Sequence, residues 1–541
     1  MSPLDVARSL RADPEAAARY RAAGWWGDAT LSARIAALAA TRPDAPAIIT
    51  PEGHLSWRDY DRASSRIAAL LAARGLDRGA RVAVLLPDGP AVHAAFVGIE
   101  RAGLVAVGIG ARAGVAEIAH LLKRTGATVL LTHRTLRDRG IETLLAEIAA
   151  LGGPVPEPMI VPDLLAEPDW IAQPSPPHPP FPDPDPDALF LINSTSGTTG
   201  MPKCVMHTQN RWQYFHRLAA DAGRFGADEI FMGAVPAPFG FGLWTAHFSP
   251  AILGAPVVVL PKFDAGVALD MIERERVTVL CCVSTQFIML LNEQAERPRD
   301  LSSLRSMFTG GEAVPYRRAA EFEEVTGAAV LQFYGSNETG ALSNTCAADS
   351  RERRLTSAGR ILPEMQVRLF DPATGAEAEG RGQPACRGPA TCLGYWDDDA
   401  ANAKLFTPDG WMLMGDIVEI DDEDYLRVVG RTSEFIIRGG KNLSAPAIEA
   451  EVATHPGIAL CAAIPAPDAV FGERVCIYVS PRPHHNPTLE DIARHLAARG
   501  VTREWFPEYL VTMEDLPRSS GGKIAKAALA EDAKRRWAVP A

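Results

Sequence analysis

The sequence predicts an α/β protein with a large N-terminal domain and a small C-terminal domain. Its 541 residues are too many for one compact core, so two or more domains are expected. Apolar residues recur at helical spacing over residues 60–74, the run RVAVLL at 81–86 indicates a strand, and another helix is indicated near 91–103. This alternation favours parallel sheets covered by helices.

The small domain is indicated by a series of short elements after Gly430. A strand and a tight turn (RGGKN) lead to a helix for which Ser444 is the expected cap. Two more strands follow, and then a helix with Thr488 as its expected cap. About 110 residues here form a separate α+β domain of ordinary size. The strands are predicted at 434–437, 460–464 and 475–479, the turn at 438–442 and the second helix at 489–498.

Composition argues against several classes of protein. The formal net charge of −12 disfavours a broad basic surface, and with it a nucleic-acid partner. None of the eight cysteines forms a CxxC pair, so no zinc or redox motif is indicated and reduced thiols are expected. The N-terminal residues carry early acids and lack the apolar segment of a signal peptide, and no apolar run approaches the length of a membrane span. We therefore expect a cytoplasmic protein without a membrane span.

Proline is concentrated in residues 154–187. The end of this stretch, PSPPHPPFPDPDPDA, cannot form a helix or a central strand, because proline lacks the backbone donor that both require. We expect a surface connection here.

A strand followed by a loop rich in glycine and hydroxyl groups indicates a polyphosphate site. The apolar residues 189–192 run into STSGTTGMPK at 194–203. This loop offers unhindered backbone N–H groups, hydroxyls and one cation, which together suit phosphate oxygens, although the spacing is not that of a Walker A loop. The predicted phosphate-binding residues are Thr195, Ser196, Gly197, Thr198, Thr199, Gly200 and Lys203.

A second segment joins an aromatic face to a carboxylate. After a Gly-Gly-Glu run at 310–312, the chain continues with QFYGSNET at 332–339. Tyr334 offers a flat face for a purine, and Glu338 offers a hard oxygen ligand suited to Mg²⁺.

With these motifs in this order, the chain resembles the acyl-adenylate-forming superfamily, which includes acyl-CoA synthetases, the adenylation domains of peptide synthetases and firefly luciferase. The resemblance runs from Leu31 to Lys526. It implies a large domain of parallel sheets with packed helices and a distorted β-barrel subdomain, and a small α+β domain on a hinge. The implied boundaries are 1–430 for the large domain, 431–434 for the hinge and 435–541 for the mobile domain.

The resemblance also implies roles for individual residues. Glu338 would bind Mg²⁺, and Asp416 and Arg431 would contact the ribose of ATP. Lys523, in the loop RSSGGKI, would be the catalytic lysine that bridges the substrate carboxylate and the α-phosphate. Asn337 stands where the family usually has threonine, and Met414 and Glu434 also depart from the usual residues. The remaining implied nucleotide-binding residues are Gly311, Glu312, Tyr334, Gly335, Ser336, Asn337 and Thr339.

A second half-reaction is implied as well. Rotation of the small domain would move Lys523 out and bring Gly439 and Gly440 to line a tunnel for a thiol. No carrier-domain motif is fused to the chain, so the acceptor is expected to be coenzyme A. The implied cofactors and substrates are therefore ATP, Mg²⁺, coenzyme A and a small carboxylic acid. The sequence leaves open whether the protein forms a homodimer.

The segment VPAPFGFGLWTAH at 235–247 corresponds to the family's acyl pocket. Phe239 and Phe241 make it apolar, and Gly242, like Gly240, is expected to leave space. No acid is present to pair with an α-ammonium group, which disfavours an amino acid as substrate. The details PKCVMHTQN, GIGARAG and YGSNETGALS resemble ligases for alicyclic or medium-chain acids, the cyclohexanecarboxylate–CoA ligase type, and an aryl acid stays open.

Three alternatives share these motifs. One is a stand-alone enzyme that loads a carrier protein, and another is a non-catalytic protein that binds an acyl-adenylate. The third is an oxygenase of the luciferase type, which would consume O₂.

Overall fold

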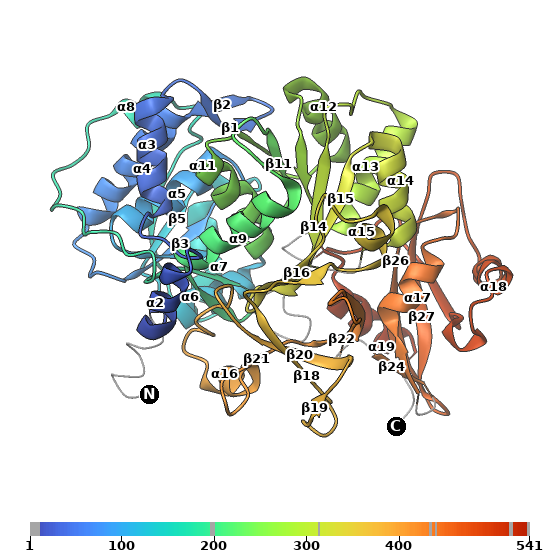
Figure 1. The fold of residues 1–541 in the computed structure, drawn as a ribbon. Coiled ribbons are helices and arrows are strands. Elements are labelled where there is room, and N and C mark those ends of the chain that lie inside the picture. Colours follow the sequence, from blue (N-terminus) through green and yellow to red (C-terminus); the bar gives the residue numbers. More distant parts are fainter. Residues whose placement is uncertain are drawn as a thin grey trace.

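The computed structural model describes residues 11–194, 201–311, 314–431, 435–438, 441–518 and 523–537 (Figure 1). These residues form four sheets of five or more strands. Figure 1 shows the small domain, coloured orange to red, beside the helices α13 (Ser284–Glu296) and α14 (Tyr316–Thr326) of the large domain.

The first large sheet has six strands in the order β10-β9-β4-β3-β5-β8. All of its pairs are parallel except that of the edge strand β10 with β9. The predicted elements at 60–74, 81–86 and 91–103 are confirmed as α4, β3 and α5. The bounds are β3 (Arg81–Leu85), β4 (Val105–Gly108), β5 (Val129–Thr132), β8 (Glu157–Ile160), β9 (Leu189–Ser194) and β10 (Cys204–Thr208), with α3 (Leu31–Thr41), α4 (Trp57–Ala72), α5 (Pro90–Arg101), α6 (Val115–Thr125) and α7 (Ile141–Ala150).

The second sheet has nine strands in the order β17-β16-β15-β14-β13-β11-β12-β1-β2. Its six inner strands, β15 to β1 in that order, are parallel, and their residues are mostly buried. The bounds are β1 (Pro46–Thr50), β2 (Gly53–Ser56), β11 (Phe231–Gly233), β12 (Val257–Val259), β13 (Val279–Cys281), β14 (Ser306–Gly310), β15 (Ala329–Ser336), β16 (Gly340–Asn344) and β17 (Arg360–Ile361), with α9 (Gln209–Gly223), α11 (Ser249–Leu253), α12 (Ala265–Glu275) and α15 (Arg351–Thr356).

An antiparallel sheet forms the third part of the large domain, where the sequence predicts an additional β subdomain. Its order is β19-β18-β20-β22-β23, and β21 also pairs with β20. The bounds are β18 (Gln366–Phe370), β19 (Glu377–Ala378), β20 (Arg381–Arg387), β21 (Met412–Leu413), β22 (Asp416–Ile420) and β23 (Leu426–Arg431), with α16 (Asp399–Leu405).

The small domain is an α+β unit, as predicted. Both expected caps are confirmed, because the side chains of Ser444 and Thr488 accept hydrogen bonds from the backbone N–H groups of Ala447 and Asp491. The strands predicted at 460–464 and 475–479 lie within longer strands at Ile458–Asp468 and Gly472–Pro481, and the strand predicted at 434–437 corresponds to one at Phe435–Arg438. The bounds are β24 (Phe435–Arg438), β25 (Lys441–Ser444), β26 (Ile458–Asp468), β27 (Gly472–Pro481) and β28 (Tyr509–Thr512), with α17 (Ala445–Val452), α18 (Leu489–Ala498) and α19 (Lys526–Arg536).

The proline-rich stretch is a connection for most of its length. Residues 174–187 contain no helix or strand, as predicted. The earlier part differs, because Glu157–Ile160 forms the edge strand β8 and Asp169–Ala172 forms the short helix α8. Proline is tolerated in β8 because an edge strand has one side that pairs with no neighbour.

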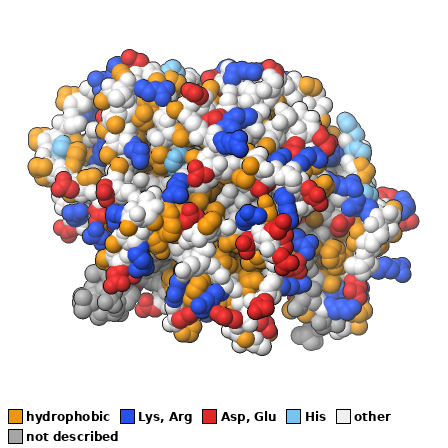
Figure 2. All heavy atoms as spheres, viewed as in Figure 1, with side chains coloured by type: hydrophobic (Ala, Val, Ile, Leu, Met, Phe, Trp, Pro, Cys, Tyr) orange, Lys and Arg blue, Asp and Glu red, His pale blue; other side chains and the backbone are white. Residues whose placement is uncertain are grey.

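The surface carries both signs of charge. On the face drawn in Figure 2, Lys and Arg are interspersed with Asp and Glu. Among the described residues, no helix has both the length and the apolar character needed to cross a bilayer. None of the eight cysteines, all of which lie in the described residues, forms a disulfide.

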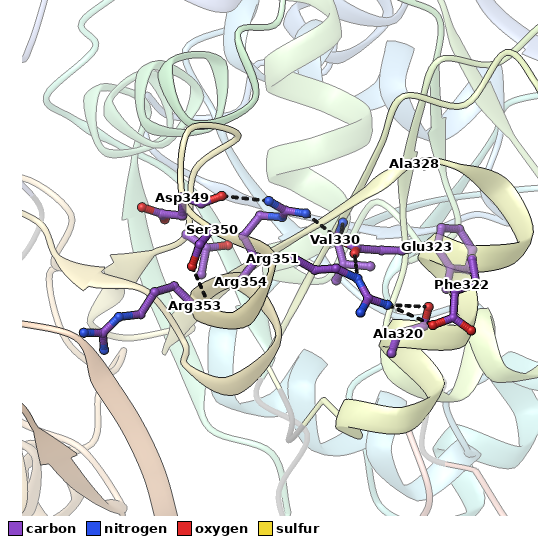
Figure 3. Close-up of polar contacts among 12 residues, drawn as sticks. Ala320, Phe322, Glu323, Ala328, Val330, Asp349, Ser350, Arg351, Arg353 and Arg354 are labelled. Carbon is purple, nitrogen blue, oxygen red and sulfur yellow. Dashed lines mark hydrogen bonds and ion pairs between the residues drawn. The ribbon is translucent and has the colours of Figure 1, made fainter.

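A buried carboxylate fixes the start of β15, the strand that leads into the predicted nucleotide segment. Glu323 of α14 accepts hydrogen bonds from Arg351 Nε (2.8 Å), Arg354 (3.0 Å) and the backbone N–H of Val330 (2.9 Å), as Figure 3 shows. The Glu323 side chain is only 9% exposed. The contacts therefore tie α14, β15 and α15 together at the end of the strand opposite Tyr334.

Replacing this carboxylate should destabilise the large domain. We expect Glu323→Gln to lower the free energy of unfolding by about 3 kcal/mol, because it leaves the partly buried Arg354 guanidinium without its carboxylate. Urea unfolding followed by tryptophan fluorescence measures the effect. The matched control is Glu324→Gln, whose side chain is 70% exposed and pairs with the same Arg351. It should cost less than about 1 kcal/mol, and equal effects of the two changes would contradict the interpretation.

Candidate active site

The candidate site lies where parallel strands of both large sheets end. Strands β15 and β14 are adjacent, and β11 is separated from β14 by β13 alone. At their carboxyl ends they lead to the segment 334–339, to Gly311 and to the segment 235–247, respectively. In the first sheet, β9 leads to the predicted phosphate loop. Ligands of open α/β sheets bind at the carboxyl ends of the strands. The fold thus gathers motifs that are more than a hundred residues apart.

Tyr334, Asp416 and Arg431 form one hydrogen-bonded group. The Tyr334 hydroxyl donates to Asp416 Oδ2 (2.9 Å), and Arg431 Nε lies 3.1 Å from Asp416 Oδ1. Burial, followed by the charge of Asp416, raises the pKa of Tyr334 well above its ordinary value, so the hydroxyl keeps its proton. The structure therefore brings together the residues predicted to bind adenine and ribose.

A tight turn follows Tyr334. The Ser336 hydroxyl accepts hydrogen bonds from the backbone N–H groups of Glu338 (3.2 Å) and Thr339 (3.0 Å), and Thr339 Oγ1 accepts one from Ser336 N (3.1 Å). A side chain at Gly335 would collide with the carbonyl of Gly340 across the hairpin. These residues shape the turn, and their predicted contacts with a nucleotide stay predictions.

Asn337 is bonded to a residue that sequence reasoning missed. Its Nδ2 donates to Asn193 Oδ1 (2.7 Å), and Asn193 Nδ2 donates back to Asn337 Oδ1 (3.3 Å). Asn193 lies in β9, directly before the phosphate loop. The pair therefore connects the loop of one sheet to the turn of the other.

A buried guanidinium lies beneath this pair. Arg211 of α9 donates to the carbonyls of Asn337 (2.7 Å), Glu338 (3.1 Å) and Ala390, and to His207 Nδ1. Arg211 is 0% exposed. Burial lowers the pKa of Arg211 to about 10, so the guanidinium stays charged at neutral pH. Arg211 carries no motif signal in the sequence, because its carbonyl partners come from two distant segments, 337–338 and 390.

The bonds to His207 fix its tautomer. A guanidinium can only donate, so His207 Nδ1 accepts from Arg211, and His207 Nε2 therefore donates to Asn193 Oδ1 (2.7 Å). Burial, together with the charge of Arg211, lowers the pKa of His207 well below its ordinary value. The histidine is neutral at neutral pH.

Glu338 offers its carboxylate where the sequence predicts Mg²⁺. Its Oε1 accepts a hydrogen bond from the Tyr395 hydroxyl (2.6 Å). In the described part of the chain, no cluster of three or more His, Cys, Asp or Glu is arranged to hold a metal ion. Mg²⁺ usually binds through one or two carboxylates together with substrate phosphates. A single carboxylate fits an ion that arrives with ATP, whose phosphates would supply other ligands.

Lys523 reaches the site from the small domain. Its ammonium donates to the carbonyl oxygen of Gly311, at the end of β14. Arg438 and Lys441, on the predicted thiol-tunnel turn, pair instead with Glu508 and Glu504 of their own domain. Some of the predicted site residues lie outside the part of the chain that the structure describes, and the predictions for them stay predictions. They are Thr195, Ser196, Gly197, Thr198, Thr199, Gly200, Glu312, Gly439, Gly440 and the hinge residues 432–434.

The predicted acyl segment is tightly packed. Phe241 lies against Phe333, with ring centroids 5.0 Å apart, while Phe239 packs with Val235 and Val283. Trp244 is buried among aromatic rings and belongs to the core.

The two glycines of this segment do not open a space. A Cβ at Gly240 would lie 2.6 Å from Asn337 Oδ1, and one at Gly242 would collide with the carbonyl of Pro236. The space where a Cβ would project is already filled by protein atoms at both glycines. The prediction that they leave room there for an acyl group is therefore wrong. They allow close approach of neighbouring chain segments.

Acid should destabilise the fold through His207. An unfolded histidine takes up a proton near pH 6.5, but folded His207 does not. Unfolding therefore takes up a proton below pH 6.5, and the free energy of unfolding should fall by about 1.4 kcal/mol per pH unit for this residue. Glutamine can donate to Asn193 and accept from Arg211 as the neutral ring does.

We expect His207→Gln to retain most stability at pH 7 and to show a shallower loss between pH 6.5 and 5, by about 1.4 kcal/mol per pH unit. Urea unfolding across this range measures it. The exposed His178→Gln is the control and should keep the wild-type slope. A wild-type slope in His207→Gln would contradict the assignment.

Comparison with known proteins gives a consistent result over nearly the whole chain. The family profile described as AMP-binding enzyme matches residues 35–396, and that of the AMP-binding enzyme C-terminal domain matches 447–523. The medium-chain fatty-acid–CoA ligase of Escherichia coli is 28% identical, over 96% of this chain and 93% of its own. The indoleacetate–CoA ligase of Aromatoleum aromaticum is 31% identical, over 90% and 95%.

A solved structure shares the fold. The ATP-bound crystal structure of MatB from Rhodopseudomonas palustris is 27% identical, with a TM-score of 0.80 over 94% of this chain and 100% of its own.

Proposed function

Because the chain belongs to the AMP-binding enzyme family, we propose that it activates an apolar carboxylic acid with ATP and transfers the acyl group to coenzyme A. The observation that carries this proposal is the position of Lys523. A lysine of the small domain meets Gly311 at the strand ends that also hold Glu338 and the Tyr334–Asp416–Arg431 group. Residues spread over more than two hundred positions of the chain, from Gly311 to Lys523, thus lie near one another.

The nucleotide would bind at the strand ends. Tyr334 would lie against the adenine, while Asp416, oriented by Tyr334 and Arg431, would accept the ribose hydroxyls. Lys203 and the loop before it would bind the phosphates. Glu338 would hold Mg²⁺, which neutralises phosphate charge when it is bound.

In the first step, a carboxylate oxygen attacks the α-phosphorus of ATP and the bond to the β-phosphate oxygen breaks, releasing pyrophosphate. The chemistry needs no covalent bond to the protein, so positioning and charge stabilisation supply the rate. The Lys523 ammonium would lie between the attacking oxygen and the α-phosphate. In the second step, the thiolate sulfur attacks the acyl carbon, AMP leaves, and a thioester forms.

The second step would use a different placement of the small domain, with residues 431–434 as the hinge between 1–430 and 435–541. The arrangement described here supports the first step, because Lys523 points into the site while Arg438 and Lys441 pair within their own domain. Domain rotations that reuse one site are a known means of separating half-reactions.

The acid is proposed to be apolar and without an α-ammonium group. Phe239 and Phe241 supply an apolar lining, and the segment 235–247 contains no acidic residue. Two relatives are named for a medium-chain fatty acid and for indoleacetate, and this supports an alicyclic, medium-chain or aryl acid. Both relatives are named as CoA ligases, and this supports coenzyme A as the acceptor. The enzyme is proposed to be cytoplasmic.

Acid-dependent exchange between ATP and pyrophosphate tests adenylation. We expect exchange with Mg²⁺ and at least one of cyclohexanecarboxylate, benzoate and the straight-chain acids from butanoate to decanoate. The matched control is 1-aminocyclohexanecarboxylate, which adds only an ammonium group and should give no exchange. Absence of exchange with the whole panel would falsify the enzyme assignment.

Mass spectrometry after addition of coenzyme A should then detect the acyl-CoA. Acylation of a carrier protein without any acyl-CoA would instead favour the carrier-loading alternative. Oxygen consumption would indicate an oxygenase.

Lys523→Ala should separate the two half-reactions. Removing the ammonium should slow adenylation by about a hundredfold or more, because it stabilises charge in that transition state. Thioester formation from supplied acyl-adenylate should stay within about threefold of wild type, because the lysine would lie outside the site in that step. Lys534→Ala, an exposed lysine of the same domain, is the control. Equal loss in both half-reactions would contradict domain alternation.

A further inference from the structure

Tyr395 connects two of the predicted ATP-binding side chains, yet no motif singled it out. It lies in the large domain, between the third sheet's strand β20 and helix α16, and is 5% exposed. The segment around it runs antiparallel to β10. Val205 pairs with Tyr395, and the backbone N–H of Trp396 donates to the carbonyl of Cys204 (2.8 Å). Tyr395 therefore lies beside the strand that begins directly after Lys203.

The backbone of Tyr395 is fixed in place. Its N–H donates to Asn402 Oδ1 (2.8 Å), and Asn402 Nδ2 donates to its carbonyl (2.9 Å). Two such bonds to one amide, together with the pairing to β10, hold the residue in a single orientation. A side chain on so constrained a backbone can position its neighbours.

The hydroxyl of Tyr395 orients the Glu338 carboxylate. The O–H donates to Glu338 Oε1 at 2.6 Å, a length typical of a bond to a charged acceptor. A carboxylate can only accept, so the phenol is the donor of this bond. The bond selects one rotamer of a side chain that otherwise loses conformational entropy when it binds a cation.

The ring of Tyr395 holds the second group. The Lys203 ammonium lies 4.7 Å from the centre of the ring, within the range of a cation–π interaction. The Lys203 side chain is long and exposed. The same tyrosine thus contacts the predicted phosphate-binding cation with its face and the predicted metal-binding carboxylate with its hydroxyl.

We propose that Tyr395 is a positioning residue that sets the distance between Lys203 and Glu338, so that both meet one Mg²⁺–polyphosphate. The inference rests on the proposed function, since it assigns Glu338 to the metal and Lys203 to the phosphates. Its two contacts act through different atoms. They are therefore separable by mutation.

Binding of a non-hydrolysable ATP analogue, α,β-methylene-ATP, measured by calorimetry with and without Mg²⁺, tests the proposal without turnover. Tyr395→Phe keeps the ring and loses only the bond to Glu338. We expect its binding without Mg²⁺ to stay within about twofold of wild type. The affinity gained from Mg²⁺ should fall by about tenfold, the usual effect of losing a hydrogen bond to a charged group.

Tyr395→Leu removes the ring as well. We expect it to lose the same Mg²⁺-dependent gain in affinity. Its affinity for the analogue without Mg²⁺ should also fall by about threefold, the usual size of an exposed cation–π contact. A double-mutant cycle supplies the independent check. In the background of Glu338→Gln, Tyr395→Phe should cause no further loss of the Mg²⁺-dependent gain.

Tyr425 is a matched control in the same domain. Its hydroxyl donates to Asp349 (2.8 Å), and the Arg353 guanidinium lies 4.4 Å from its ring centre. It thus makes the same two kinds of contact away from the site. Tyr425→Phe and Tyr425→Leu should bind the analogue as wild type does, with and without Mg²⁺.

The outcomes separate this inference from the function it rests on. Wild-type Mg²⁺ dependence in Tyr395→Phe would overturn the positioning role while leaving the enzyme assignment intact. If Tyr395→Phe lost the same factor of affinity for the analogue with and without Mg²⁺, the positioning role would also be overturned, because such a loss indicates a structural role. A wild-type protein that binds no analogue would reject the proposed function itself.

Discussion

The geometry of the site depends on a buried cation, the guanidinium of Arg211. A charge removed from water is costly unless its donors are matched, and here the partners are backbone carbonyls and a neutral imidazole. The imidazole belongs to β10, which directly precedes α9. The carbonyls belong to the turn after β15 and to the segment after β20. The guanidinium can be buried only when all of them are in place. Formation of the site and folding of the large domain are therefore coupled.

The network around Arg211 also explains a departure from the family pattern. Asn337 stands where threonine is usual, and its amide exchanges two hydrogen bonds with Asn193. Asn193 in turn is bonded to His207, which accepts from Arg211. Asn337 is thus matched to its surroundings through side chains, and the backbone of the same residue is held by Arg211. A substitution at any of these positions would disturb the others, because they belong to one connected hydrogen-bond network.

Much of the fold was predictable from the sequence, because helices, strands and caps are signalled locally. The periodicity over 60–74 and the caps Ser444 and Thr488 need only neighbouring residues, and the structure agrees with them. The gathering of Tyr334, Asp416 and Lys523 at one site followed from a family resemblance, not from spacing. Arg211, Asn193 and Tyr395 were missed because their partners lie in other segments. Gly240 and Gly242 were misinterpreted for the same reason, since the atoms that a Cβ would meet come from tertiary packing.

Two kinds of contact hold the small domain against the large one: an apolar cluster and a directional hydrogen bond. One apolar cluster contains residues of both domains, among them Leu291 and Leu460, and it supplies non-directional attraction. The bond from Lys523 to the Gly311 carbonyl is directional and occupies the lysine that adenylation would use. A carboxylate and an α-phosphate are charged acceptors and would compete well with that neutral carbonyl. Adenylation turns the charged carboxylate into a neutral mixed anhydride and releases pyrophosphate. The added attraction on Lys523 would therefore weaken before the second step, so the chemistry itself would bias the domain between its two placements.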